Sequence, residues 1–201
     1  MKTFFILSVS ACLAAGASAT TFTLQGLALP SNDTVHVTGP GVLTNDVYAG
    51  PENASLNGGP SFRVFCADLG HLSNGGATPV SLVDTSLPLV GSGYKLAAKL
   101  YNKYSPTVGN DQDANAALQV AIWEAIFPSA TITDVAPAGI VAQANILLGS
   151  DLSAVSDKAT YYDMGNANQS MIGGYQAVPE PTSMAALGLG ALALVKRRKR
   201  A

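Results

Sequence analysis

Short apolar runs alternate with clusters of turn-forming residues along the first part of the chain. Between residues 20 and 89, Gly, Pro, Asn, Ser and Thr separate runs that are either continuously apolar or alternate polar with apolar positions. The runs cover residues 21–29, 34–38, 62–69 and 80–83. Short runs bounded by turn formers predict β-strands joined by tight turns, at a spacing that suits a small sandwich or barrel.

The hydrophobic period changes at Gly93, where the pattern becomes helical. Leu96, Leu100 and Tyr104 recur every four residues, so one face of a helix is apolar. We expect this helix to stop before Ser105-Pro106, because a proline disfavours helical backbone in the residue that precedes it.

Two further helices follow, and the end of the domain is ambiguous. A polar turn with Asp111 or Asp113 as N-cap precedes a helix over 114–126, and a third helix is expected between 137 and 148. The segment 160–175 is compatible with two closing strands. The sequence shows no internal repeat, and it predicts the α+β class, with a β-rich sandwich or barrel lobe and a helical lobe.

The N-terminal residues have the three parts of a secretory signal peptide. Lys2 supplies the positive charge, an apolar stretch follows, and Ala17-Ser18-Ala19 is a small-residue cleavage site. We therefore expect signal peptidase to remove residues 1–19 and to leave Thr20 as the first residue. A lipoprotein reading with Cys12 is the alternative, but it leaves an apolar region of only about six residues.

The C-terminal residues also have three parts, namely a stiff motif, a short apolar run and a basic cluster. Val178-Pro179-Glu180-Pro181 precedes the uncharged residues 182–195, and residues 196–200 are all Lys or Arg. The apolar run would make about 21 Å of helix against a bilayer core of about 30 Å, so it predicts a short and weakly anchored transmembrane helix. The basic cluster would remain on the cytoplasmic side.

This order of parts over residues 178–201 resembles the PEP-CTERM sorting signal of Gram-negative bacteria. The resemblance implies recognition by an exosortase, cleavage near Val178–Pro181, and release of the domain at residues 20–177 after a transient stay in the inner membrane. It also implies delivery to the cell surface or to the extracellular polymer matrix. An ordinary C-terminal membrane anchor is the alternative.

The expected mature domain is acidic and contains a single cysteine. Residues 20–177 hold five basic and twelve acidic residues, a net charge of −7, which argues against nucleic-acid binding. Cys66 has no partner for an internal disulfide, so it is either a reactive thiol, an intermolecular link or a small buried hydrophobe. Two histidines beside one cysteine give no metal-ligand spacing, so we expect no metal and no cofactor.

Two short segments carry the residues for an unusual chemistry. Phe65-Cys66-Ala67 lies on a predicted strand, where Asp68 would share the face of Cys66. On the predicted second helix, Gln119 and Trp123 lie one turn apart, and an amide in an apolar turn needs partners if it is buried. The Cys66 sulfur could attack the Gln119 side-chain carbonyl and expel ammonia, which would give an internal thioester, provided that Trp123 and Phe65 exclude water.

The same residues resemble the motifs of bacterial thioester domains. Phe65-Cys66-Ala67 is similar to their aromatic-Cys-small motif, and residues 118–123 are similar to their apolar-Gln-x-x-apolar-Trp motif. The resemblance spans about residues 46–127 and includes Val47-Tyr48-Ala49-Gly50. It implies a surface adhesin with a Cys66–Gln119 thioester, a β lobe and a helical lobe that carries the glutamine.

The expected function is therefore covalent attachment to an amine or hydroxyl of a surface or matrix partner, which could be a polysaccharide, a protein or a polyamine. Such a chain acts once and is not an enzyme. Asp68 and His71 are supporting candidates, and His36 is a weaker one, since all three could assist proton transfer. The alternatives are a non-covalent matrix protein, in which Gln119 lies on the helix surface, and a hydrolase that pairs Cys66 with His71.

Overall fold

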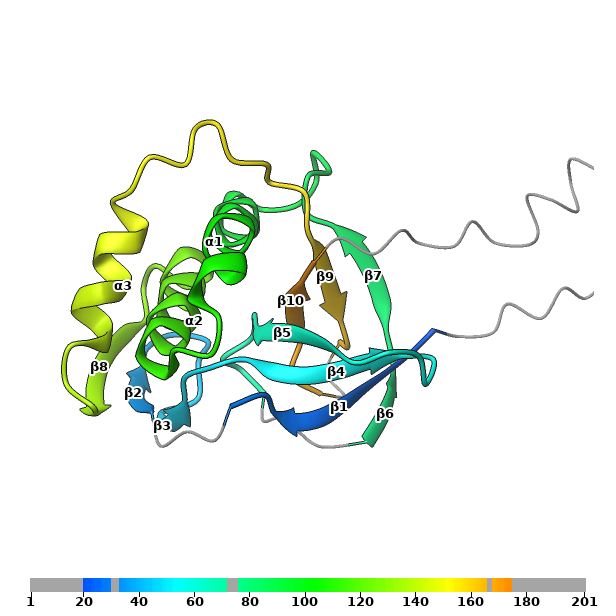
Figure 1. Ribbon diagram of the computed structural model, residues 1–201, viewed down its shortest axis with the longest axis horizontal. Coiled ribbons are helices and arrows are strands. Elements are labelled where there is room, and N and C mark those ends of the chain that lie inside the picture. Colours follow the sequence, from blue (N-terminus) through cyan, green and yellow to red (C-terminus); the bar gives the residue numbers. More distant parts are fainter. Residues whose placement is uncertain (1–19, 30–32, 72–75, 166–167, 175–201) are drawn as a thin grey trace, which may run out of the picture. The chain divides into compact units, whose positions relative to one another are not determined.

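Seven antiparallel strands from both ends of the domain form the main sheet of the computed structural model (Figure 1). The structure describes residues 20–29, 33–71, 76–165 and 168–174. The strand order is β6-β1-β4-β5-β10-β9-β7. The seven strands are β1 (Thr21–Leu27), β4 (Glu52–Leu56), β5 (Phe62–Cys66), β6 (Gly76–Pro79), β7 (Ser81–Asp84), β9 (Thr160–Asp163) and β10 (Met171–Gly173).

The two edges of this sheet are joined by consecutive residues, so the sheet is nearly closed. β6 and β7 are the edge strands, and only Val80 separates them in the chain. Three aromatic rings pack together on strands β1, β5 and β9. The Phe22 and Tyr162 ring centres lie 4.9 Å apart, and those of Phe62 and Tyr162 lie 5.7 Å apart. The large buried aromatic area stabilises the lobe that the turn-rich part of the sequence predicts.

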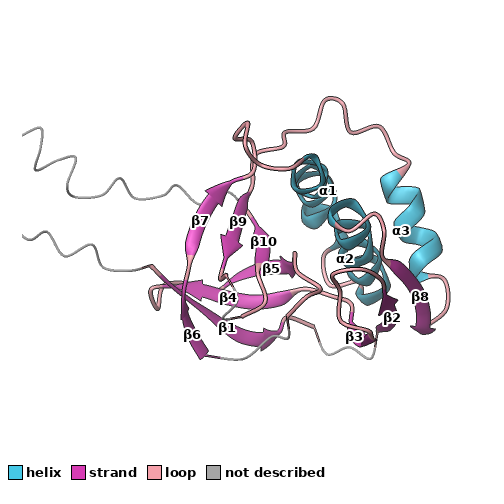
Figure 2. Ribbon diagram, turned by 180° about the vertical axis from the view of Figure 1, so that it is seen from behind, coloured by secondary structure: helices cyan, strands magenta, loops and turns pink. Residues whose placement is uncertain are grey.

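A smaller sheet has the order β3-β2-β8 and lies near the helices (Figure 2). Its strands are β2 (Thr34–Thr38), β3 (Asn45–Tyr48) and β8 (Thr131–Ala136). Val35 and Val37 alternate along β2 and are fully buried, and Ile132 of β8 joins the same core. This alternation is the period of two that a strand with one covered face requires.

Three helices form the second lobe, with α2 between the other two (Figure 1). They are α1 (Ser92–Val108), α2 (Gln112–Ile126) and α3 (Ile140–Leu148). Ten of the fifteen residues of α2 are buried. A helix that is buried on almost every side lies at the centre of a hydrophobic core, whereas an amphipathic surface helix exposes one face to solvent.

The α+β prediction is confirmed, with a β-rich lobe and a helical lobe that carries Gln119. The second predicted helix begins after Asp111, whose carboxylate accepts the Ala114 N–H at 3.0 Å, so Asp111 and not Asp113 is the N-cap. The ambiguous segment 160–175 contributes two closing strands, β9 and β10.

The expected end of the first helix before Ser105-Pro106 is wrong. α1 continues through Pro106 to Val108. Tertiary contacts hold its last turns, because Asn102 donates to the Ser156 carbonyl at 2.8 Å and the Tyr104 hydroxyl donates to Ser150 at 2.7 Å. These contacts outweigh the local preference of a residue before proline.

The expectation that Asp68 lies on the strand of Cys66 is also wrong, since β5 ends at Cys66. Strands β3, β4, β6 and β8 were not expected as separate elements, because their residues lack a clear apolar period. The expected signal peptide (1–19), the sorting tail (178–201) and the short transmembrane helix within it lie outside the described residues. Among the residues that are described, no helix is long and apolar enough to cross a membrane.

Candidate functional site

The side chain of Gln119 replaces a missing strand beside Cys66. β4 pairs with β5 in a register that puts Glu52 opposite Val64, so Gly50 would come opposite Cys66, but β4 begins only at Glu52. The Cys66 N–H donates to Gln119 Oε1 at 2.9 Å, and Gln119 Nε2 donates to the Cys66 carbonyl at 2.8 Å. The carboxamide therefore satisfies both main-chain groups as a backbone peptide would.

Gln119 reaches this position because α2 is held firmly against β5. Gln119 is fully buried on α2, so the alternative of a glutamine on the helix surface is wrong. Arg63 of β5 donates to the Gly109 carbonyl at 2.5 Å and to the Asn110 side chain at 3.1 Å, which ties the strand to the turn between α1 and α2. The buried amide has its partners, as burial of a polar group requires.

The Cys66 sulfur lies in a nearly closed environment and contacts the loop that follows β5. Its thiol donates to the Asp68 carbonyl at 2.8 Å, the Asp68 N–H donates to the sulfur at 3.3 Å, and the residue is 5% exposed. Burial raises the pKa of the Cys66 thiol far above its ordinary value, and the charges of Asp68 and Glu52 add to this rise. The thiol is therefore protonated at neutral pH in the absence of a further trigger.

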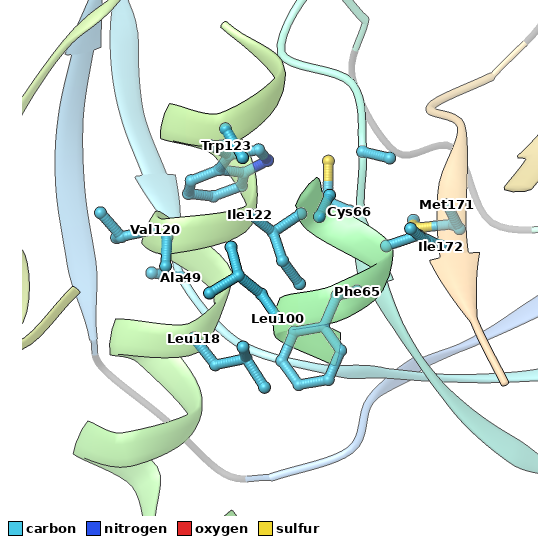
Figure 3. Close-up of a cluster of buried hydrophobic side chains, with 14 of the residues drawn as sticks. Ala49, Phe65, Cys66, Leu100, Leu118, Val120, Ile122, Trp123, Met171 and Ile172 are labelled. Carbon is cyan, nitrogen blue, oxygen red and sulfur yellow. The ribbon is translucent and has the colours of Figure 1, made fainter. Parts of the chain in front are cut away.

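The indole N–H of Trp123 faces the Cys66 sulfur (Figure 3). Trp123 is 1% exposed, and its Nε1 makes no well-formed hydrogen bond with any described residue. It lies close enough to the sulfur to lower the pKa of the thiol, although burial outweighs this effect. A buried donor that points at a sulfur without a full hydrogen bond is available to a charge that develops there.

A pocket of about 400 Å³ opens over the sulfur. Its walls come from strands β1, β3, β4 and β5, from helix α2 and from four loops. The side chains on these walls that bear on chemistry are those of Asp46, Tyr48, Glu52, Cys66, His71, Trp123 and Gln169. A small molecule or an extended side chain from a partner can therefore approach Cys66 from this side.

The structure brings most of the expected site residues together, but Phe65 is an exception. Phe65 is fully buried and packs edge-on against Tyr101 of α1, with ring centres 6.0 Å apart, on the side of the helical lobe. Asp68 does not contact the Gln119 amide. Its carboxylate accepts the Gly70 N–H at 2.7 Å and pairs with His71 Nδ1 at 2.7 Å. His36 pairs with Asp46 on the smaller sheet.

Three pocket residues did not stand out as site residues in the sequence. Gln169 donates to the Asp68 carbonyl at 2.8 Å from a position 101 residues further along the chain. Tyr48 and Glu52 line the pocket beside it. The local signal is the segment Val47-Tyr48-Ala49-Gly50 of the resemblance, in which any side chain at Gly50 would collide with the Tyr48 ring. Within the described ranges, no three His, Cys, Asp or Glu side chains could together hold a metal ion.

Comparison with known proteins gives one match to a family and one to a solved structure. Residues 177–200 match the PEP-CTERM protein-sorting motif. The fold is similar to the N-terminal thioester domain of fibronectin-binding protein SfbI from Streptococcus pyogenes, with 12% identity and a TM-score of 0.40, over 70% of this chain and 91% of that one. No curated protein matches the chain.

The sorting motif points to an exported protein that is associated with the cell surface and is processed by an exosortase during export. This agrees with the resemblance that Val178-Pro179-Glu180-Pro181 and the following residues show in the sequence.

Proposed function

We propose that the exported domain is a covalent binder whose Cys66 and Gln119 side chains form an internal thioester. The observation that carries the proposal is the docking of the fully buried Gln119 carboxamide on the main chain of Cys66 itself, with hydrogen bonds of 2.9 and 2.8 Å. A nucleophile and an electrophile that are held in one place react as if at effective concentrations of about 10⁵–10⁸ M.

Formation of the thioester needs an activated carbonyl and a destination for the thiol proton. The Cys66 N–H donates to Oε1, the atom on which negative charge grows when sulfur attacks the amide carbon. The Sγ–C bond forms, the C–Nε2 bond breaks, and the thiol proton leaves with the nitrogen as ammonia. The indole N–H of Trp123 favours the thiolate that makes the attack.

Survival of the thioester needs the exclusion of water. Cys66 is 5% exposed and Gln119 is fully buried, so little of the bond would be open to bulk water. A thioester is an activated acyl group, and a dry site prevents its early hydrolysis.

Capture of a partner would then occur once per molecule. An amine or hydroxyl that enters the pocket would attack the Gln119 carbonyl, form an amide or ester, and release the Cys66 thiol. The domain would remain attached to the partner through this amide or ester bond, and no second activated acyl group would be left for another partner. Such a protein is not an enzyme, and its use at an exported location is adhesion to a surface or matrix component such as a polysaccharide, a protein or a polyamine.

A non-covalent matrix protein is the second candidate, and the same two hydrogen bonds favour it. Gln119 hydrogen-bonds to the main chain of β5 at a position that lies before the start of β4. This structural role requires no covalent reaction. In that case Cys66 is a buried thiol with a raised pKa and no reaction partner.

The intact mass of the purified protein distinguishes the two candidates. The thioester form is lighter than the sequence mass by one ammonia, and methylamine treatment adds one methylamine to the peptide that contains Gln119. Cys66→Ala and Gln119→Ala should both keep the full mass and ignore methylamine. Gln143→Ala, on the exposed side of α3, is the matched control and should behave like the wild type.

If the wild-type protein has the full sequence mass and its thiol reacts only after denaturation, the covalent proposal is wrong. The non-covalent matrix protein is then the remaining candidate.

A further inference from the structure

The loop that follows β5 holds a histidine that lines the pocket in contact with a carboxylate. Asp68 Oδ2 lies 2.7 Å from His71 Nδ1, and the Asp68 side chain is only 15% exposed. Asp68 Oδ1 accepts the Gly70 N–H at 2.7 Å, so the carboxylate is fixed at both oxygens. With Nδ1 engaged as a donor to the carboxylate, the free Nε2 of a neutral imidazole is a proton acceptor.

The same loop is bonded to the sulfur. The Asp68 N–H donates to Cys66 Sγ, and the Asp68 carbonyl accepts from the Cys66 thiol and from Gln169 Nε2, both at 2.8 Å. His71 and Cys66 line one pocket. An incoming group in this pocket therefore has the imidazole, which is 39% exposed, and the sulfur on its walls.

The capture step requires two proton transfers, one from the attacking group and one to the departing sulfur. The entering amine or hydroxyl has to lose a proton as it attacks, and the departing sulfur is in a place where burial raises the pKa of its thiol. A bare thiolate is unfavourable there, so a group that accepts the first proton and returns it to the sulfur would assist both halves of the reaction.

We propose that His71, positioned by Asp68, is the general base of the capture step, which rests on the proposed function. The nucleophile's lone pair forms the new bond to the Gln119 carbonyl carbon while its proton passes to His71 Nε2. The C–Sγ bond then breaks, and the proton moves from Nε2 to Cys66 Sγ. No other reactant is needed, and His71 ends in the state in which it began.

The groups that share the pocket with the imidazole are Cys66 of β5, Asp46 and Tyr48 of β3, and Glu52 of β4, with Asp68 in its own loop. Among the described residues that line the pocket there is no Lys or Arg to take the place of His71 as a proton carrier. Asp46 itself pairs with His36, which makes the His36–Asp46 pair a natural comparison for the His71–Asp68 pair.

The test measures capture by the full protein after intact mass has shown that the thioester is present. Glycerol is the probe for the pH profile, because its hydroxyl does not titrate in the range used, and methylamine is the second probe. We expect His71→Gln to keep the ammonia-loss mass but to capture glycerol at least tenfold more slowly than the wild type. The dependence of the wild-type rate on pH should be weaker in the variant, because the proton acceptor is gone.

Two controls make the outcome specific. His36→Gln removes the other histidine of the sequence and should leave rate and pH profile unchanged. Added imidazole should restore capture in His71→Ala, which a purely structural role of His71 would not allow.

Capture by His71→Gln at the wild-type rate and with the wild-type pH profile would overturn the role of His71 and leave the thioester intact. Absence of the ammonia-loss mass in the wild type would instead overturn the proposed function.

Discussion

Gln119 and Cys66 meet through the glutamine side chain and the cysteine main chain, across 53 residues of sequence. The carboxamide takes the place that β4 would occupy if the strand began at Gly50 and not at Glu52. One side chain therefore does two things: it satisfies the end of a central strand, and it brings an acyl group to the residue that carries the only thiol among the described residues. Because both roles depend on the same contacts, the experiments below separate structure from chemistry.

Loss of the Gln119 amide should destabilise the domain even where no thioester can form. In a Cys66→Ala background, the further change Gln119→Ala leaves a buried N–H and a buried carbonyl without partners. We expect a loss of roughly 2–4 kcal/mol in the free energy of unfolding, measured by urea denaturation. Gln143→Ala in the same background should change it by less than about 0.5 kcal/mol, since its side chain is exposed on a helix. Equal stability of Cys66→Ala and the double variant would show that the two hydrogen bonds contribute nothing.

The indole N–H of Trp123 should matter for the rate at which the thioester forms. Trp123→Phe keeps an aromatic ring in the core but removes the donor that faces the sulfur. We expect the ammonia-loss mass to appear about tenfold or more slowly after refolding, because the thiolate and the developing charge lose a donor. Time-resolved intact mass measures this rate, and circular dichroism checks that the variant has refolded. An unchanged rate in a folded variant would mean that the donor plays no part.

The N-cap of α2 should support the helix that carries Gln119. Asp111 accepts the Ala114 N–H at 3.0 Å, and its replacement by Ala leaves that group unpaired. We expect Asp111→Ala to cost about 0.5–2 kcal/mol in the free energy of unfolding. Asp113→Ala, in the exposed first turn of the same helix, removes a charge of the same sign without removing a cap, and should cost less. The two urea midpoints decide the matter, and a larger effect at Asp113 would contradict the assignment of the cap.

Glu124 should make the stability of the domain depend on pH. Burial raises the pKa of the Glu124 carboxyl, and its Oε2 finds no hydrogen-bond partner among the described residues. A raised pKa in the folded state means that the neutral form is favoured by folding. This contribution to the free energy of unfolding is complete below the pKa of about 4.3 that the carboxyl has in the unfolded chain. It is lost as pH rises through the higher pKa that the carboxyl has in the folded state.

Glu124→Gln keeps the shape of the neutral acid at every pH. We therefore expect this variant to unfold at a higher temperature than the wild type at about pH 7, with the difference disappearing near pH 4. Thermal unfolding followed by circular dichroism at the two pH values provides the measurement. A variant that is less stable than the wild type at pH 7 would show that the ionised carboxylate is well solvated or paired.

The sequence by itself determined the class of fold, because the hydrophobic period and the positions of turn-forming residues are local properties of the chain. The alternation in residues 34–38 and the four-residue spacing of Leu96, Leu100 and Tyr104 depend only on which side chains must leave water. The candidate pair Cys66 and Gln119 could also be picked out from the sequence, because a lone thiol and an amide in an apolar turn are unusual. The C-terminal sorting motif could also be recognised from the sequence, because its stiff, apolar and basic parts follow one another within 24 residues.

Only the tertiary structure decided how those residues meet. Pro106 stays in a helix because Asn102 and Tyr104 bond to a distant loop, and Phe65 faces the helical lobe rather than the pocket. The sequence offered Asp68 and His71 as separate candidates, and their pairing depends on β5 ending at Cys66 and on the loop that bonds to the sulfur. Contacts between residues far apart in the chain depend on where strands stop and which groups are left without partners, and no local pattern of side chains records this.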